Sequence, residues 1–305
     1  MRICSLLPSG TEIAFALGLG NDVVAVTHEC DYPAEARMLP VVTRTALDGS
    51  RGSRDIDRHV DQAAHSGSSI YALDQETIER LNPDLILTQE LCEVCAVSYD
   101  TARAAVQKLP GERTVLSLGA TTIEGILDTI EQVGAVAGVP DRAAAVVQEM
   151  KERIGRVAAL ASTAPIRSRV FAMEWLDPPY TAGHWVPEMI RLAGGFDALG
   201  REGAFSYETT WDAIAKWDPE VLVLMPCSFH LDRTLEELDT LSLPEEWRKL
   251  AAVRSGRVFA VDSASYFSRS GPRIADGLEI LGEIIHPELF PRTSPPDAWR
   301  NVPAR

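Results

Sequence analysis

The segment 141–161 constrains the fold more than any other part of the sequence, because it has the composition of a long helix. Its Ala, Val, Glu, Lys and Arg residues favour helix. About 20 residues at 1.5 Å per residue span ~30 Å, the width of a small lobe. No Gly/Ser-rich linker occurs here. We therefore expect a rigid helical connector between two lobes, which permits only small hinge motions.

Short apolar runs alternate with helical patterns on both sides of this connector. Such alternation is typical of βαβ units and of a mostly parallel sheet. Strands are predicted at 3–7, 23–27, 85–88 and 114–118, and again at 169–174, 221–225 and 258–261. Helices are predicted at 12–17, 76–81, 99–108 and 122–137, and then at 186–193, 210–216, 235–241 and 274–285. The Pro-rich residues from 287 onward are expected to wrap the surface.

The chain of 305 residues is thus predicted to be an α/β protein with two Rossmann-like lobes, mostly parallel sheets and one long helix between the lobes. We place the N-terminal lobe at 1–140, the linking helix at 141–161 and the C-terminal lobe with its surface tail at 162–305. A weak internal repeat also suggests two equivalent lobes. Asn82-Pro83 and Asp218-Pro219 each follow a helical pattern and lead into a strand, although two occurrences can arise by chance.

Charge and hydropathy narrow the class of protein. The formal net charge is −15 and the sequence pI is about 4.9, and such a surface repels phosphate backbones, so nucleic acid is not an expected partner. No apolar stretch approaches the ~18–20 residues that span a membrane, and the first residues lack the apolar core of a signal peptide. We therefore expect a cytoplasmic protein without membrane insertion, or an exported one if the start codon is assigned wrongly.

Two segments of the first lobe follow predicted strands, and loops at the carboxyl ends of parallel strands form ligand crevices. Ser9 lies at the first strand–helix junction, where free backbone N–H groups can bind a polar ligand edge; the alternative is a plain helix cap made by Thr11. A polar group after the second strand suits metal ligation, hydrogen bonds to ligand amides or aromatic packing, or else forms only a polar turn. Its members are His28, Glu29, Cys30, Asp31 and Tyr32.

Cys92 and Cys95 form a Cys-x-x-Cys pair within a set of five widely spaced cysteines. The pair is redox-active, metal-binding or ordinary packing. A thioredoxin-like role is disfavoured, because the pair follows the third or fourth strand and not the first. A structural zinc site needs four ligands. His28 and Cys30 supply the other two if both loops line one crevice, so zinc or another metal is a candidate cofactor.

Aromatic residues gather after the first strand of the second lobe. Flat rings bury a large area at little entropic cost and suit a flat ligand, although they can also form a packing cluster under a loop. The candidates here are Trp175, Tyr180, His184 and Trp185. Three further candidates follow the later strands on the same expected side, namely Phe229, Phe267 and Arg269.

The sequence contains no nucleophile elbow, His-Glu-x-x-His helix, phosphate loop or dinucleotide fingerprint. We therefore expect a ligand-capturing protein and not an enzyme. A metal- or thiol-dependent enzyme that uses His28, Cys92 and Cys95 is the alternative from a different class.

An ordered set of motifs resembles the cobalamin- and iron-chelate-binding proteins of ABC importers, and most closely their cobalamin-binding branch. The segments are LLPSGTE at 6–12, DYP at 31–33, LNPDLI at 81–86, PPYTAG at 178–183, AGG at 193–195 and SGPRI at 270–274. The resemblance implies two lobes linked by one helix, which hold cobalamin or a related corrinoid between them with little movement. It also implies an ABC transporter permease as a partner, and a cleft lined by Ser9, Tyr32, Tyr180, Trp185 and Phe267.

The role and the ligand both have alternatives at this stage. His28-Glu29-Cys30 and the Cys92–Cys95 pair lie outside the importer pattern, so a carrier, a sensor and an importer component all remain open, as do haem, a siderophore or a metal ion as ligand. His28 is expected either to coordinate the cobalt of a corrinoid or to hydrogen-bond the group that does; otherwise it shapes the turn. The candidate ligand-binding residues are Ser9, His28, Glu29, Tyr32, Cys92, Trp175, Tyr180, His184, Trp185, Phe229, Phe267 and Arg269.

Overall fold

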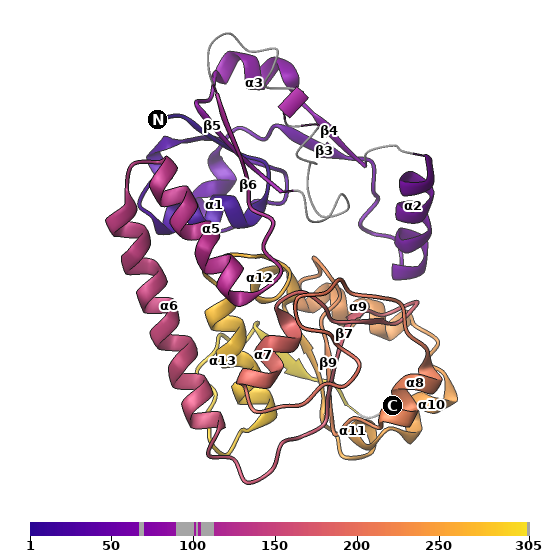
Figure 1. Ribbon diagram of the computed structural model, residues 1–305. Helices are drawn as coiled ribbons and strands as arrows, with labels where there is room; N and C mark the ends of the chain where they lie inside the picture. Colours follow the sequence, from indigo (N-terminus) through magenta and orange to yellow (C-terminus); the bar gives the residue numbers. More distant parts are fainter. Residues whose placement is uncertain (67–69, 90–100, 102, 105–112, 304–305) are drawn as a thin grey trace.

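The computed structural model describes residues 1–66, 70–89, 101, 103–104 and 113–303. These residues form two α/β lobes, one above the other, with one long helix running alongside both (Figure 1). The predicted fold class is therefore confirmed. Most of the predicted helix at 99–108 and the whole Cys92–Cys95 pair fall outside the described residues.

The N-terminal lobe is built on a parallel sheet in the order β2-β1-β5-β6. Ile3 and Cys4 are both buried on this sheet, one in each of two hydrophobic clusters, as expected for a parallel sheet covered on both faces. The strands of the sheet are β1 (Ile3–Ser5), β2 (Val23–Ala25), β5 (Leu85–Thr88) and β6 (Thr114–Ser117). The helices of this lobe are α1 (Pro8–Ala16), α2 (Ser53–Ser66), α3 (Gln75–Leu81) and α5 (Ile123–Val136). Its 3-10 turns are η1 (Gly20–Asp22) and η2 (Ala34–Met38).

Helix α1 begins earlier than the sequence pattern predicts. Thr11 is not the cap; the helix starts at Pro8, and Leu7 occupies the cap position without a side-chain hydrogen bond. Proline suits the first helical position because its missing N–H has no intrahelical partner there. Gly10 permits this early start, since a Cβ at this position would lie 2.9 Å from Leu7 Cδ2 and 2.9 Å from Ser5 Oγ.

The C-terminal lobe is built on a mixed sheet in the order β11-β10-β9-β7-β8. The three inner strands are parallel, and the two edge strands are antiparallel to their neighbours. The strands are β7 (Val170–Trp175), β8 (Tyr180–Thr181), β9 (Val221–Leu224), β10 (Val258–Val261) and β11 (Trp299–Asn301). The helices are α7 (Val186–Leu192), α8 (Trp211–Trp217), α9 (Leu231–Thr240), α10 (Glu245–Lys249), α11 (Ala251–Arg254), α12 (Ser263–Tyr266) and α13 (Ile274–Ile285).

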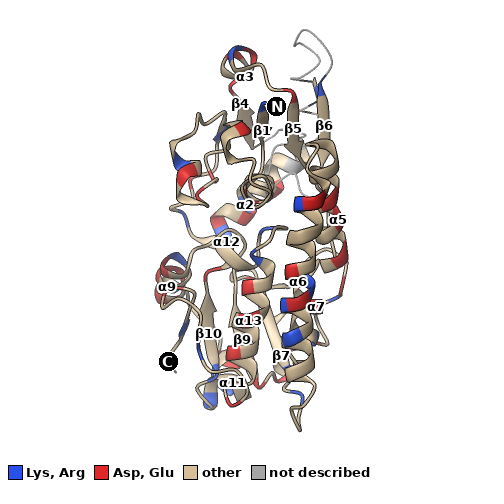
Figure 2. Ribbon diagram, turned by 90° about the vertical axis from the view of Figure 1, so that its left-hand side faces the viewer, with Lys and Arg blue, Asp and Glu red and all other residues tan. Residues whose placement is uncertain are grey.

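Helix α6 (Pro140–Ala161) connects the lobes without a break. Val147, Met150 and Val157 are buried in the hydrophobic cluster that also contains residues of both lobes, while acidic and basic residues lie along the helix on the side viewed in Figure 2. Arg153 makes hydrogen bonds to Asp276 and Glu279 of α13. The connector is thus packed along its length and is not a free linker.

The two Asn/Asp-Pro turns occupy equivalent places in the two lobes. Asn82 ends α3 with φ of 46°, and Asp218 ends α8 with φ of 47°. Both residues adopt the left-handed conformation that stops a helix, and each is followed by a proline and an inner strand of its sheet.

The C-terminal segment ends as a strand. β11 pairs with β10, an interaction that the Pro-rich composition does not predict. Glu283 of α13, buried at 4% exposure, holds the segment in place by accepting hydrogen bonds from Thr293, Ser294 and Trp299.

Helix α2 and a small antiparallel pair, β3 (Thr43–Thr45) with β4 (Tyr71–Leu73), extend the N-terminal lobe away from α6 (Figure 1). The sequence pattern predicts none of these three elements. Helix α2 supplies Ile56, Asp57, Val60 and Asp61 to one wall of the cavity described below.

Candidate functional site

A cavity of about 580 Å³ lies between the two lobes. This volume falls within the ~300–1,000 Å³ typical of small-molecule sites. The strands of both lobes point their carboxyl ends at it, because wall residues follow directly after the strands: Leu7 and His28 in one lobe, Met225 and Ser263 in the other. This is the edge of a parallel sheet where ligands bind.

The structure brings most of the sequence-predicted ligand residues to this one cavity. Those that line it are Ser9, His28, Glu29, Trp175, Tyr180, His184, Trp185, Phe267 and Arg269. Tyr32 and Phe229 do not line it. Cys92 lies outside the described residues, as does Cys95.

Tyr32 and Phe229 instead support residues around the cavity. The guanidinium carbon of Arg273 lies 4.1 Å from the centroid of the Tyr32 ring, which is 48% exposed. The Phe229 ring packs edge-on behind Trp175, with the ring centroids 5.3 Å apart. Tyr32 and Phe229 each lie within a few residues of the chain from residues that line the cavity, which is why the sequence suggests them as ligand contacts. Their side chains, however, do not line the cavity.

The structure does not place Cys30 as a metal ligand. Its Sγ lies 3.1 Å from Thr11 Oγ1 and 3.2 Å from Thr27 Oγ1, away from the cavity wall, and burial raises the pKa of the thiol. No group of three or more His, Cys, Asp or Glu side chains is placed to hold a metal ion in the part of the chain that the structure describes.

His28 is held by one ring nitrogen. Nδ1 lies 2.7 Å from Thr43 Oγ1 of β3, and the same oxygen accepts the backbone N–H of His28 at 3.1 Å. The Tyr71 ring of β4 packs against the imidazole at a centroid distance of 5.8 Å. Burial lowers the pKa of His28, so the neutral ring is favoured near pH 7. The ring is therefore anchored to a strand outside its own turn, through Thr43.

The aromatic wall is fixed by hydrogen bonds to backbone carbonyls. Trp185 Nε1 donates to Phe267 O at 3.1 Å, and Trp175 Nε1 donates to Ser53 O at 3.2 Å. The His184 ring lies edge-on to Phe205 at 5.3 Å, and its backbone has φ of 54°. Rings held in this way offer preorganised apolar surface to a ligand.

The cavity wall is rich in carboxylates. The acidic residues that line it are Glu29, Asp31, Asp57, Asp61 and Glu174. Burial raises the pKa of Glu174, whose carboxylate accepts from Gly183 N and Ser206 Oγ. Burial and the neighbouring Asp61 raise the pKa of Asp57, to which Tyr180 donates. Among the described wall residues, the one Lys or Arg side chain is Arg269.

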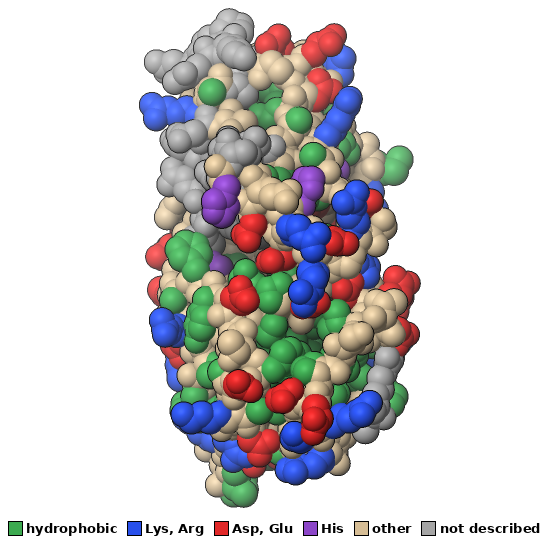
Figure 3. Space-filling view, turned by 90° about the vertical axis from the view of Figure 1, so that its right-hand side faces the viewer, with side chains coloured by type: hydrophobic (Ala, Val, Ile, Leu, Met, Phe, Trp, Pro, Cys, Tyr) green, Lys and Arg blue, Asp and Glu red, His purple; other side chains and the backbone are tan. Residues whose placement is uncertain are grey.

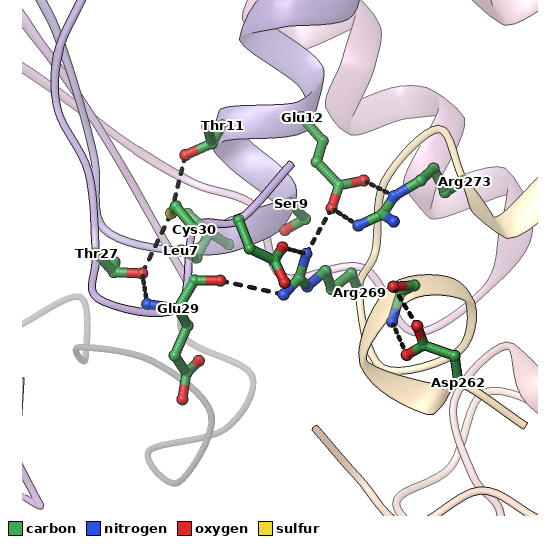
Figure 4. A network of polar contacts seen from close by, with 12 residues as sticks. Leu7, Ser9, Thr11, Glu12, Thr27, Glu29, Cys30, Asp262, Arg269 and Arg273 are labelled. Carbon is green, nitrogen blue, oxygen red and sulfur yellow. Dashed lines mark hydrogen bonds and ion pairs between the residues drawn. The ribbon is translucent and has the colours of Figure 1, made fainter. Parts of the chain in front are cut away.

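Arg269 is already neutralised by a buried charge cluster that joins the lobes (Figure 4). Its guanidinium donates to Asp31 Oδ1 at 2.5 Å, to Glu12 Oε1 at 3.1 Å and to the carbonyl of Glu29 at 3.1 Å. Arg273 donates twice to the same Glu12 carboxylate. The Glu12 and Arg269 side chains are 2% and 9% exposed. We call Glu12, Asp31, Arg269 and Arg273 the interlobe cluster.

His230 extends the interlobe cluster at the cavity wall. Its Nε2 lies 3.3 Å from Asp31 Oδ2 and its Nδ1 lies 3.0 Å from Asp262 Oδ1. These two hydrogen bonds raise the pKa of His230 to about 9. Burial alone would raise the pKa of Asp31, but its hydrogen bonds with His230 and Arg269 hold that pKa well below its usual range. Glu12, Arg273 and His230 are not predicted from the sequence, since none follows a strand directly.

On the opposite side, α2 crosses the cleft and binds the C-terminal lobe. Buried Glu237 of α9 accepts from Ser53 N and Ser53 Oγ, both at 2.7 Å. Exposed Arg54 makes two hydrogen bonds to Asp177. Figure 3 views this side of the molecule, where acidic and basic side chains mix between the two lobes. No helix in the described ranges is long and apolar enough to cross a membrane.

The chain is similar in sequence to substrate-binding proteins of ABC transporters and in fold to solved periplasmic binding proteins. The ABC transporter substrate-binding lipoprotein YvrC of Bacillus subtilis, itself uncharacterised, is 28% identical over 298 residues, which cover 95% of this chain and 81% of the relative. The vitamin B12-binding protein of Vibrio cholerae is 25% identical over 290 residues, covering 91% of this chain and 86% of the relative. A solved periplasmic heme binding protein from Pseudomonas aeruginosa has a TM-score of 0.73 at 21% identity, covering 100% of this chain and 99% of that chain. That structural likeness concerns the fold alone.

The expectation of a cytoplasmic protein is wrong. The family model described as periplasmic binding protein matches residues 3–264, and the relative from Bacillus subtilis is a lipoprotein, so the chain groups with exported proteins. The export segment of such a protein is no part of its folded lobes, and the folded residues therefore carry no signal of the compartment. With most of its length matched, the chain is a substrate-binding protein and belongs to the periplasmic binding protein family.

Proposed function

We propose that this protein captures cobalamin or a related corrinoid between its lobes and delivers it to the permease of an ABC importer. The family supports a binding role, and a relative that covers most of the chain is a vitamin B12-binding protein. The aromatic wall supports a large flat ligand, because Trp175, Tyr180 and Trp185 present ring surface to one cavity.

The charge of the cavity wall is the observation that carries the choice of ligand. Haem brings two carboxylates, whereas the edge of a corrin ring carries neutral amides that donate hydrogen bonds and surround a positively charged cobalt centre. Four wall carboxylates that are not ion-paired with an arginine can accept such donors, namely those of Glu29, Asp57, Asp61 and Glu174. The fifth, Asp31, is already bonded to Arg269 and His230, and Arg269 has no free charge to offer a propionate because Glu12 and Asp31 neutralise it. Burying an anion beside unpaired carboxylates costs several kcal/mol unless protons are taken up.

Titration with matched ligands tests the proposal. Purified protein is incubated with aquacobalamin or with haem and then desalted, and the retained ligand is measured by its absorption. We expect corrinoid to be retained at one equivalent and haem to bind at least about tenfold more weakly. Retention of haem with loss of corrinoid would overturn the proposal.

A charge variant sharpens this test. Asp57→Asn combined with Asp61→Asn removes two wall carboxylates and is expected to narrow the preference for corrinoid over haem. Asp55→Asn, on the exposed side of the same helix, is the matched control and leaves the preference unchanged.

A further inference from the structure

His28 has one ring nitrogen committed to the protein and one that is not. Thr43 Oγ1 fixes the Nδ1 edge of the imidazole, and Thr43 is itself buried on β3. The Nε2 edge has no hydrogen-bond partner among the described residues and lies 4.0 Å from Glu29 Oε1. The side chain is 27% exposed and belongs to the cavity wall. A ring oriented through one nitrogen, with the other open to a ligand, is the usual arrangement of a metal-binding histidine.

The surroundings of His28 do not suit a bare metal ion. Such an ion needs three or four protein ligands, and the described residues hold no cluster of that size. Cys30, the neighbour with the best donor atom, is turned inward to Thr11 and Thr27. One histidine is sufficient only where the metal arrives with its equatorial positions already filled, as in a macrocycle.

We infer that His28 Nε2 becomes an axial ligand of the metal at the centre of the bound macrocycle, an inference that rests on the proposed corrinoid-binding function. The Nε2 lone pair forms the bond to cobalt(III), and a water molecule leaves the same axial position. The ring proton resides on Nδ1 and is donated to Thr43 Oγ1, and no electron is transferred. Thr43 is then a positioning residue, because it acts on the ligand only through the imidazole.

Corrinoids differ in whether a ligand on cobalt can be exchanged for the His28 imidazole. Aquacobalamin and aquacobinamide each have an exchangeable water on cobalt, and the second also lacks the nucleotide base that fills the other axial position. Cyanocobalamin has both axial positions occupied. Imidazole ligation therefore changes the visible bands of the two aqua forms and leaves those of cyanocobalamin unchanged.

Absorption spectra of the full chain test the inference directly. Aquacobinamide mixed with wild-type protein is expected to show the band shift produced by a nitrogen ligand. His28→Ala abolishes the shift while tryptophan quenching still reports bound corrinoid. His184→Ala, which removes another of the histidines that line the cavity, keeps the shift. Thr43→Val leaves the shift at saturation but weakens aquacobinamide binding by roughly 10–100-fold, the usual effect of removing the partner of a ligating histidine.

The possible failures are separable. Corrinoid that is retained without any band shift, or a shift that persists in His28→Ala, overturns axial ligation and leaves corrinoid binding intact. Failure to retain any corrinoid overturns the proposed function itself. Tryptophan quenching by bound corrinoid in His28→Ala excludes misfolding as the cause of a lost shift, because a misfolded variant cannot hold the ligand.

Discussion

Arg269 of the C-terminal lobe donates to Asp31 of the N-terminal lobe over 2.5 Å, with the Arg269 side chain only 9% exposed. The contact joins residues 238 positions apart in the sequence. It is the centre of the interlobe cluster, so the two lobes are held together by buried charge as well as by α6.

Loss of Arg269 should destabilise the whole protein. Arg269→Met removes the guanidinium that donates to Asp31, to buried Glu12 and to the Glu29 carbonyl, and breaking such a buried pair costs about 3–5 kcal/mol. Urea denaturation measures the change in the free energy of unfolding. Arg54→Met, which breaks an exposed pair with Asp177, serves as the control and costs less than about 1 kcal/mol. A loss below about 1 kcal/mol for Arg269→Met would show that the cluster does not stabilise the fold.

Stability should fall at alkaline pH through His230. Its pKa rises from 6.5 to about 9 on folding, because Asp262 and Asp31 accept hydrogen bonds from the imidazolium. A group with a raised folded pKa contributes fully below pH 6.5, and the contribution is lost as pH rises through about 9. Thermal midpoints of wild type and His230→Gln are therefore expected to differ at pH 6 and to converge above pH 9. His59→Gln, exposed on α2, should follow wild type throughout. Parallel curves for wild type and His230→Gln contradict the assignment.

Truncation of Trp185 should weaken corrinoid binding. Its ring is 6% exposed at the cavity wall, and removing a desolvated aromatic anchor costs about 2 kcal/mol or more, or roughly 30-fold in affinity. Trp217→Ala is the matched control, since Trp217 also donates to a backbone carbonyl but lies away from the cavity. Both variants lose stability, and only Trp185→Ala loses affinity. A change within about twofold for Trp185→Ala would remove this residue from the site.

Release of α2 should change rates more than affinity. Glu237 does not line the cavity, but its carboxylate holds the first residue of α2 by two hydrogen bonds. Hydrogen bonds to a charged group contribute about 1.5–3 kcal/mol. Glu237→Gln is therefore expected to raise both the association and dissociation rates of corrinoid by about tenfold, while Kd stays within about threefold. Stopped-flow quenching measures both rates. Glu283→Gln, which alters a buried carboxylate far from the cleft, should leave both unchanged. A rise in the dissociation rate alone would mean that α2 only contacts the ligand.

The sequence predicts the fold well where local pattern determines it. The composition of 141–161 is that of a helix, and α6 spans nearly the same residues. Apolar strands such as β9 are buried on both faces, so hydrophobicity alone identifies them. The helix ends at Asn82 and Asp218 are also predictable from local sequence, because the proline after each residue disfavours continuation of the helix.

The sequence does not predict elements and side-chain positions that depend on contacts between residues far apart in the chain. The sequence of α2 is largely polar, and the helix depends on Ile56, which is buried, and on Glu237 from the other lobe. Glu12 and Arg273 are 261 residues apart, and no spacing rule connects them. Cys30 is a plausible metal ligand from its position, but its rotamer places sulfur against two threonines. The order of strands indicates which loops meet, and it does not determine where a side chain points.

The interlobe cluster and α6 hold the two lobes together on the same side of the molecule. Arg273, which bonds to Glu12, immediately precedes α13, and Arg153 of α6 bonds to α13 itself. The interlobe cluster and α6 are therefore both attached to the C-terminal lobe around α13. Helix α2 lies on the opposite side of the molecule (Figure 1). A rotation of one lobe against the other about α13 would have to stretch the bonds of Ser53 to Glu237 and of Arg54 to Asp177, and its displacement grows with distance from α13. Such a turn moves α2 farther than it moves the interlobe cluster, so a distance label on α2 is the place to observe lobe motion.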